Sequence, residues 1–124
     1  LFSAKQPIIG NSFMKTKKLL SDEELYTAIN EIILPSFELI EDKWKKIKTI
    51  DGPIHLVDIK FELGFKVSDN SLVLSDVVDN DSWRIWPGGD PTKQLDKQSF
   101  REGEDLVNVA NKYQLVTKLT NQFN

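Results

Sequence analysis

The sequence predicts an α+β fold, in which an antiparallel sheet is flanked by helices. Apolar residues recur every three or four positions in the first half of the chain, a spacing typical of an amphipathic helix. In the middle of the chain they alternate with polar residues, which is typical of a half-buried strand. Toward the C-terminus the helical spacing returns.

The composition is that of one globular domain. The 124 residues are 40% hydrophobic and 28% charged, and their formal net charge of −3 argues against nucleic acid and anionic membranes as partners. Because the chain has no cysteine and one histidine, any metal should be a hard, oxygen-bound cation such as Mg²⁺. No apolar run approaches membrane-spanning length and no secretory leader is visible, so we expect a cytoplasmic protein.

The first helix is predicted to begin at Ser21. Ser21 and Glu24 have the spacing of a capping box, in which each side chain accepts a hydrogen bond from the other's backbone. Pro35 lies inside the apolar stripe and removes a backbone donor, so we expect a kink or two abutting helices. The stripe comprises Leu25, Ile29, Ile32 or Ile33, Phe37, Ile40, Trp44 and Ile47.

One long strand is predicted over residues 56–67, followed by a turn at 68–71 and a second strand over 72–78. The two strands should pair as an antiparallel hairpin. The apolar face of the first strand is expected to consist of Val57, Ile59, Phe61, Leu63, Phe65 and Val67.

Residues 79–103 read as a long loop, which is uncommon in a compact domain unless the loop is functional. Trp83 and Trp86 are expected to pack as wedges, and Gly88-Gly89 to form a turn. From residue 104 onward a final amphipathic helix is predicted. Its stripe comprises Leu106, Val109 or Ala110, Tyr113, Val116 and Leu119.

The strand also carries charges that could take part in chemistry. Period two places Asp58, Lys60 and Glu62 on one face, with successive side chains about 7 Å apart. Such a row could hold Mg²⁺ and a phosphate together, but the pattern alone favours an exposed face with cross-strand ion pairs. Asp76 could add a second carboxylate to the same cation or cap the following turn.

Arg84 could bind a phosphate or carboxylate in a bidentate fork, or stabilise its turn by pairing with Asp81. Lys97 and Arg101 are four residues apart and would share one face of a helix. His55 has no serine, cysteine or second histidine in motif spacing, so we interpret it as structural.

The strand and the loop resemble a known family. Leu56-Val57-Asp58-Ile59-Lys60-Phe61-Glu62-Leu63-Gly64 resembles the SAICAR synthetase signature, apolar-apolar-Asp-x-Lys-apolar-Glu-Phe/Ile-Gly, with Leu63 as a mild departure. The segments 74–76, 79–87 and 96–101 follow in the family's order and spacing. Residues 79–84 are particularly similar to the animal bifunctional enzymes, in which an AIR carboxylase domain is fused to the SAICAR synthetase domain.

The resemblance implies a two-lobed, ATP-grasp-like fold and a ligase of purine biosynthesis. ATP would activate the carboxylate of carboxyaminoimidazole ribotide, and the amine of aspartate would then displace phosphate to give SAICAR. The family's glycine-containing nucleotide lobe and N-terminal substrate signature are not found in this sequence. We therefore expect residues 1–124 to form a single domain, the C-terminal part of a SAICAR synthetase domain within a longer chain.

The resemblance also implies roles for individual residues. Glu62 and Asp76 match the family's Mg²⁺ ligands, and Lys60 matches a lysine near the nucleotide phosphates, where it would bind ATP and act in catalysis. The implied ligands of the ribotide are Asp81, Arg84, Lys97 and Arg101. The implied cofactors are ATP and Mg²⁺, and the implied partners are small molecules, with a homo-oligomer left open.

A shared metal site would constrain the hairpin, because side chains alternate in direction along a strand. An odd loop length, or a β-bulge of the same effect, would keep Glu62 and Asp76 on one face. A loop of residues 68–70 would pair them directly and place Asn70 in the left-handed conformation; a loop of residues 68–72 would offset them by one pair.

The alternative to a ligase is a truncated, non-catalytic paralogue that acts as an interaction or assembly domain.

Overall fold

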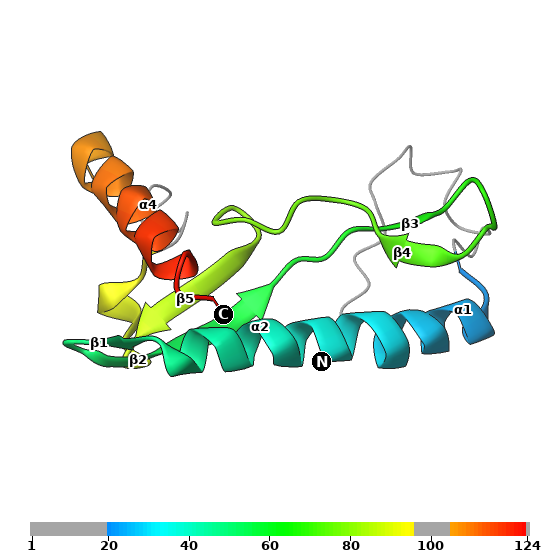
Figure 1. The fold of residues 1–124 in the computed structure, drawn as a ribbon, viewed down its shortest axis with the longest axis horizontal. Helices are drawn as coiled ribbons and strands as arrows, with labels where there is room; N and C mark the ends of the chain where they lie inside the picture. Colours follow the sequence, from blue (N-terminus) through cyan, green and yellow to red (C-terminus); the bar gives the residue numbers. More distant parts are fainter. Residues whose placement is uncertain (1–19, 96–104, 124) are drawn as a thin grey trace, which may run out of the picture.

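The computed structural model describes residues 20–95 and 105–123, and these form an α+β structure with antiparallel sheets, as the sequence predicts. Within the described residues, a three-stranded sheet has the order β1-β2-β5, and β3 and β4 form a second, two-stranded sheet. Figure 1 shows the two sheets side by side above one long helix. The elements are α1 (Asp22–Thr27), η1 (Ala28–Ile33), α2 (Leu34–Lys46), β1 (Lys48–Thr49), β2 (Gly52–Ile59), β3 (Leu63–Phe65), β4 (Leu72–Leu74), β5 (Trp83–Pro87), η2 (Pro91–Lys93) and α4 (Leu106–Thr120).

The capping box at the start of α1 is confirmed. The backbone N–H of Glu24 donates to the Ser21 hydroxyl at 3.1 Å, and the backbone N–H of Ser21 donates to the Glu24 carboxylate at 3.0 Å. Hydrogen bonding of the Glu24 carboxylate by the backbone N–H of Ser21, and then by the Ser21 side chain, lowers the pKa of Glu24. These bonds stabilise the charged form of Glu24, which also interacts favourably with the helix dipole.

Pro35 is accommodated by a change of helix type. The element η1 is a π-helix, and the N–H of Leu34 at its end bonds to the carbonyl of Ile29, five residues back. Pro35, which has no backbone N–H to donate, follows directly after this π-helical segment, in the first turn of α2. The expected kink or pair of abutting helices thus takes the form of a π-helical segment within one continuous helix (Figure 1).

The single strand predicted over residues 56–67 is wrong, because the chain changes sheets in its middle. The first part, β2, begins earlier, at Gly52, and pairs with β5, whereas β3 pairs only with β4. Residues 60–62 connect the two sheets and belong to neither strand. An alternating pattern cannot reveal such a change, because both strands keep period two.

The inward face of β2 also differs from the prediction. Ile54 and Leu56 are buried, although the expected apolar face consisted of odd-numbered residues. The register of β2 against β5 shifts between Leu56 and Asp58, which leaves Val57 as the residue of a β-bulge. Beyond the bulge the odd residues turn inward, so that Ile59 pairs with the buried Trp83.

The element β5 was not predicted, since residues 79–103 read as a loop. Trp83, Ile85 and Pro87 alternate with Arg84 and Trp86, and the first three are buried. Pro87 terminates the strand, and the turn predicted at Gly88-Gly89 follows it, with both glycines at positive φ. This turn is confirmed.

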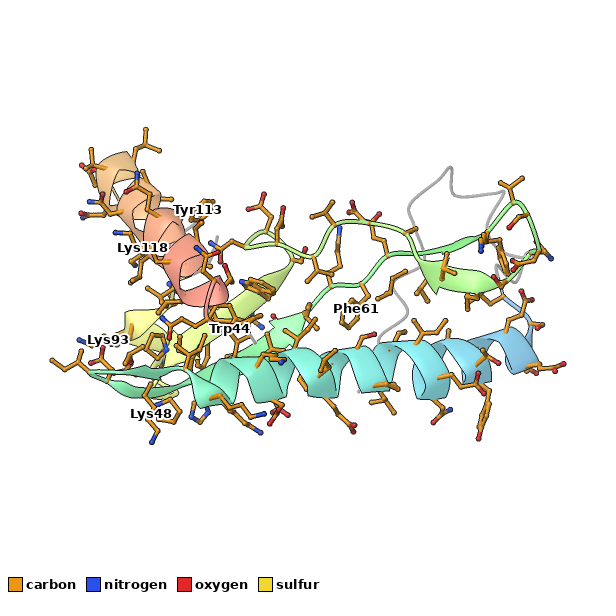
Figure 2. All side chains as sticks on the ribbon, viewed as in Figure 1. Trp44, Lys48, Phe61, Lys93, Tyr113 and Lys118 are labelled. Atoms are coloured by element: carbon orange, nitrogen blue, oxygen red, sulfur yellow. The ribbon has the colours of Figure 1, made fainter. Side chains whose placement is uncertain are left out.

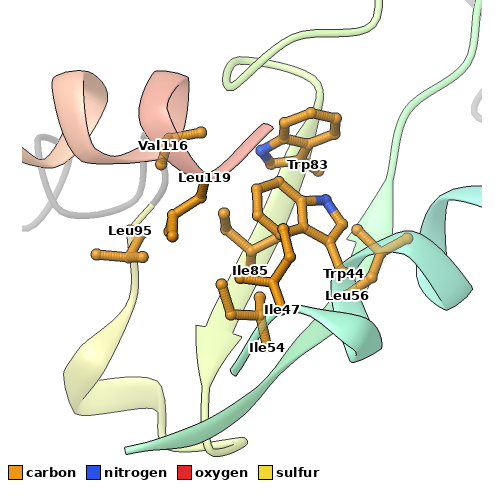
Figure 3. Close-up of a cluster of buried hydrophobic side chains, with 9 residues drawn as sticks. All are labelled: Trp44, Ile47, Ile54, Leu56, Trp83, Ile85, Leu95, Val116 and Leu119. Atoms are coloured by element: carbon orange, nitrogen blue, oxygen red, sulfur yellow. The ribbon is translucent and has the colours of Figure 1, made fainter. Parts of the chain in front are cut away.

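The core lies between α2, the β1-β2-β5 sheet and α4. Trp44 is completely buried and packs edge-to-face against Trp83, with ring centroids 5.4 Å apart. Trp83 is therefore a packing residue, as predicted. The final helix is confirmed, capped by Asp105, and two residues of its predicted stripe are buried. The core comprises Trp44, Ile47, Ile54, Leu56, Trp83, Ile85, Leu95, Val116 and Leu119 (Figure 3). Across residues 20–95 and 105–123, no helix combines the length and apolar character needed to span a membrane.

Candidate functional site

The exposed face of β2 and β5 carries an acid–base pair. Asp58 and Arg84 are direct cross-strand partners. The Arg84 Nε donates to both carboxylate oxygens of Asp58, at 3.0 and 2.9 Å, and Nη2 donates to one of them. The predicted cross-strand ion pair on this face is therefore present. Sequence reasoning did not identify Asp58 as the partner of Arg84, because 26 residues separate them.

Beyond this pair, the connection at residues 60–62 is held at both ends by backbone hydrogen bonds. The N–H of Lys60 donates to the carbonyl of Ser82 at 2.7 Å, and the N–H of Ser75 donates to the carbonyl of Glu62 at 3.0 Å. The two connections between the sheets, residues 60–62 and 75–82, consequently run side by side. Figure 1 shows both crossing between β5 and the β3–β4 hairpin.

Lys60 lies at the centre of the charges in this region. Its Nζ is 2.5 Å from Oε1 of Glu62, and both side chains are largely exposed. The hydrogen bond with Glu62 raises the pKa of Lys60, and the negative charges of Glu62, Asp76 and Asp79 raise it further. Carboxylates from both connections therefore act on one ammonium group.

The hairpin does not have the predicted register. Phe65 pairs with Leu72 and Leu63 pairs with Leu74, and the Lys66 N–H donates to the carbonyl of Ser71. The loop is therefore residues 67–70, which is four residues, and the predicted odd loop length is wrong. Asn70 has φ 58°, so the left-handed conformation predicted for it in a loop of residues 68–70 is present, but within the four-residue loop.

The cause of the four-residue loop is a local turn. The Asp69 carboxylate accepts bonds from the backbone N–H and the hydroxyl of Ser71, at 3.0 and 2.6 Å. With this Asx turn the loop covers residues 67–70, so it begins and ends one residue earlier in the sequence than the turn predicted at residues 68–71. Glu62 then lies opposite Ser75 rather than opposite Asp76.

The loop is even and the register has no bulge, so the register continued to Glu62 and Asp76 puts the two carboxylates on opposite faces, and the hairpin does not supply the shared face that the metal site was expected to need. Asp76 follows β4, and its carboxylate accepts the N–H of Val77 at 2.8 Å, which is the turn-capping alternative considered for this residue. In residues 20–95 and 105–123, no group of three histidine, aspartate or glutamate side chains is arranged to hold a metal ion. The two carboxylates share Lys60 as a neighbouring cation.

The loop before β5 is anchored by Asn80 and Asp81. Asn80 donates to the carbonyl of Leu95 at 3.2 Å and accepts the indole N–H of Trp83 at 2.9 Å. The Asp81 carboxylate accepts a hydrogen bond from the hydroxyl of Tyr113 at 3.0 Å. Sequence reasoning assigned Tyr113 only to the apolar stripe of its helix, and no local signal indicated this contact.

Of the predicted site residues, the structure places Lys60, Glu62, Asp76, Asp81 and Arg84 on or beside the two connections. Lys97 and Arg101 lie outside the described residues, so their roles stay predictions. A cavity of about 610 Å³ lies at the other end of the β1-β2-β5 sheet, between β1, η2 and α4, and none of the predicted site residues lines it.

Known proteins are similar to most of this chain. The model of the SAICAR synthetase family matches residues 3–120. The phosphoribosylaminoimidazole-succinocarboxamide synthase of Chloroflexus aggregans is 45% identical over 92 residues, which are 70% of this chain and 34% of that protein. The human bifunctional phosphoribosylaminoimidazole carboxylase/phosphoribosylaminoimidazole succinocarboxamide synthetase is 44% identical over 71 residues, which are 57% of this chain and 16% of that protein.

A solved structure has the same fold. It is a SAICAR synthetase (Type-2) in complex with ADP, which superposes with a TM-score of 0.64 at 30% identity and covers 80% of this chain and 38% of that chain. The chain spans about a third of the length of the single-function relatives it matches. The α+β class and the antiparallel sheets are thus found in a relative as well as in this chain.

Proposed function

This chain belongs to the SAICAR synthetase family, and we propose that it supplies part of the site of an ATP-dependent ligase. The reaction joins aspartate to carboxyaminoimidazole ribotide and gives SAICAR, ADP and phosphate. The observation that carries the proposal is the pair of adjacent connections at residues 60–62 and 75–82. They bring the family's Asp-x-Lys-x-Glu residues beside Asp81, in the loop before β5, and Arg84, on β5.

The charges in this region suit the reaction. ATP, the ribotide and aspartate are all anionic, so binding them together requires cations at fixed positions. Arg84 supplies one such cation, held on β5 by its fork to Asp58. Lys60 supplies another, because a lysine is protonated through the neutral range, and its hydrogen bond with Glu62 raises its pKa further. We assign Lys60 to the phosphates of ATP and Arg84 to an anionic group of the ribotide.

The donor set is suited to nucleotide-bound Mg²⁺. Glu62 and Asp76 are hard oxygen ligands, and Mg²⁺ bound with a nucleotide needs only one or two carboxylates, because water and phosphate oxygens complete its coordination. Both carboxylates act on Lys60, which supports their placement around one phosphate group. We propose that Glu62 and Asp76 hold Mg²⁺ when ATP is present. The ion would neutralise phosphate charge during transfer.

The proposal includes a larger assembly. In the relatives, the part of the chain outside the match is roughly twice as long as the matched part. One solved relative is in complex with ADP. We propose that the rest of a SAICAR synthetase domain supplies the remainder of the nucleotide site, and that this chain corresponds to the C-terminal lobe of an ATP-grasp-like fold. Lys97 and Arg101 belong to the proposed ribotide site.

The test is an assay of the full-length protein that carries this sequence. ADP release is measured with ATP, Mg²⁺ and the ribotide, with and without aspartate, and SAICAR is identified by mass. Release that depends on both the ribotide and aspartate would support the ligase. A folded protein that binds neither ATP nor the ribotide would instead support the non-catalytic interaction domain.

A further inference from the structure

A hydrogen bond connects helix α4 to the proposed ribotide site. Tyr113 lies on α4, which packs on the core of the molecule (Figure 2). Its hydroxyl donates to Oδ1 of Asp81 at 3.0 Å, across 32 residues of sequence. The bond joins the final helix to the loop that precedes β5.

The helix is a rigid support for Tyr113. Val116 and Leu119, one and two turns further along α4, are buried in the core (Figure 3). The N-terminus of α4 is capped by Asp105, whose carboxylate accepts the N–H of Val107 at 2.7 Å. A side chain anchored in this way has few alternative positions, because core packing and capping fix the backbone that carries it.

Asp81 is exposed and lies outside the strands, in the turn between β4 and β5. Its backbone is held by the carboxylate of Asp79, which accepts the Asp81 N–H at 2.9 Å. The backbone bond does not fix the Asp81 side chain, whereas the phenol hydroxyl bonds the carboxylate itself.

We propose that Tyr113 is a positioning residue that sets the orientation of the Asp81 carboxylate for ribotide binding. A carboxylate only accepts hydrogen bonds, so Asp81 would select hydroxyl or amino groups of the ribotide, while Arg84 binds an anionic group. Tyr113 acts through Asp81 and does not touch the substrate. This inference rests on the proposed function and adds a specificity-determining contact to it.

The experiment compares two single-atom changes in the full-length protein. Tyr113→Phe removes only the hydroxyl that bonds Asp81, and Tyr26→Phe removes the hydroxyl of an exposed tyrosine on α1. We expect Tyr113→Phe to raise the KM for the ribotide about tenfold, because a hydrogen bond to a charged group is involved. The KM for ATP and the thermal midpoint should change little, and Tyr26→Phe should match the wild type in every measurement.

A double-mutant cycle then tests whether Tyr113 acts through Asp81. In an Asp81→Asn background, Tyr113→Phe should raise the ribotide KM no further, since the charged acceptor is already gone. An additional tenfold rise there, or equal effects of Tyr113→Phe on the ribotide and ATP, would overturn the inference. So would unchanged kinetics in Tyr113→Phe when the wild type turns over. A wild type without ribotide-dependent turnover would overturn the proposed function together with this inference.

Discussion

Asp58 on β2 and Arg84 on β5 face each other across the sheet, and the guanidinium of Arg84 binds both oxygens of the Asp58 carboxylate. The fork holds the guanidinium against the Asp58 carboxylate. Both side chains are about half exposed, so the pair should contribute no more than about 1 kcal/mol to stability. Its main effect is therefore on the orientation of Arg84.

Arg84→Lys tests this orientation. Lysine keeps the positive charge but cannot form the planar fork, so we expect the KM for the ribotide to rise about tenfold. The KM for ATP should stay nearly constant, because the nucleotide phosphates are assigned to Lys60. Steady-state kinetics with each substrate varied in turn give both constants. Equal changes for the two substrates would indicate a purely structural role for the Asp58–Arg84 pair.

Glu62→Gln tests the proposed metal ligand. The amide keeps the size of the side chain and loses its charge, so turnover should fall by about a hundredfold or more while the protein stays folded. Glu38→Gln, on the exposed surface of α2, is the matched control and should retain full activity. Activity and circular dichroism are measured on the same samples. Wild-type turnover in Glu62→Gln would remove this residue from the site.

The pH dependence of Lys60 provides a test that needs no substrate. The pKa of Lys60 is raised by its bond with Glu62, so the stabilisation from the pair is complete below the ordinary pKa of lysine. It is lost as the pH rises through the higher folded value. NMR titration of the Lys60 side chain should show this raised pKa, and Glu62→Gln should lower it toward the ordinary value. The same titration in Glu38→Gln should match the wild type; a wild-type value in Glu62→Gln would contradict the contact.

The two adjacent glycines after β5 should differ in their tolerance of a side chain. Gly88 has φ 63°, and a Cβ there would lie 2.1 Å from the carbonyl oxygen of Asp51. Gly89 has φ 74°, but its Cβ would meet only the His55 ring, at 3.4 Å. We expect Gly88→Ala to destabilise the protein by about 2 kcal/mol or more, and Gly89→Ala by about 1 kcal/mol. Urea unfolding of both variants checks the order, and the reverse order would contradict the close approach to Asp51.

The elements predicted correctly from the sequence depend on local interactions. The capping box at Ser21 requires only residues within one helical turn, and the left-handed Asn70 only those of its own loop. The final helix was also identified, because its apolar stripe is local. In each case the residues that decide the structure are neighbours in the sequence.

The features that sequence reasoning missed depend on distant partners. The bulge at Val57 reverses the side-chain alternation of β2 relative to β5, and nothing within either strand indicates it. The contacts of Arg84 with Asp58 and of Asp81 with Tyr113 join residues 26 and 32 positions apart. Family resemblance identified Asp81 and Arg84 as candidates, but not the residues that hold them.

The π-helical segment η1 has a consequence for the residues that precede it. A π turn contains about one more residue than an α turn, and each residue of a helix advances the direction of its side chain by about 100°. Leu25 and Trp44 are 19 residues apart, so an uninterrupted α-helix would leave their side-chain directions about 100° apart, whereas one residue absorbed by η1 brings them close to alignment. Loss of a single residue within 28–33 would convert η1 to α-helix and rotate α1 by roughly 100° about its axis. A one-residue deletion is thus enough to change which face of α1 the protein presents to solvent, while α2 and the core behind it keep their positions.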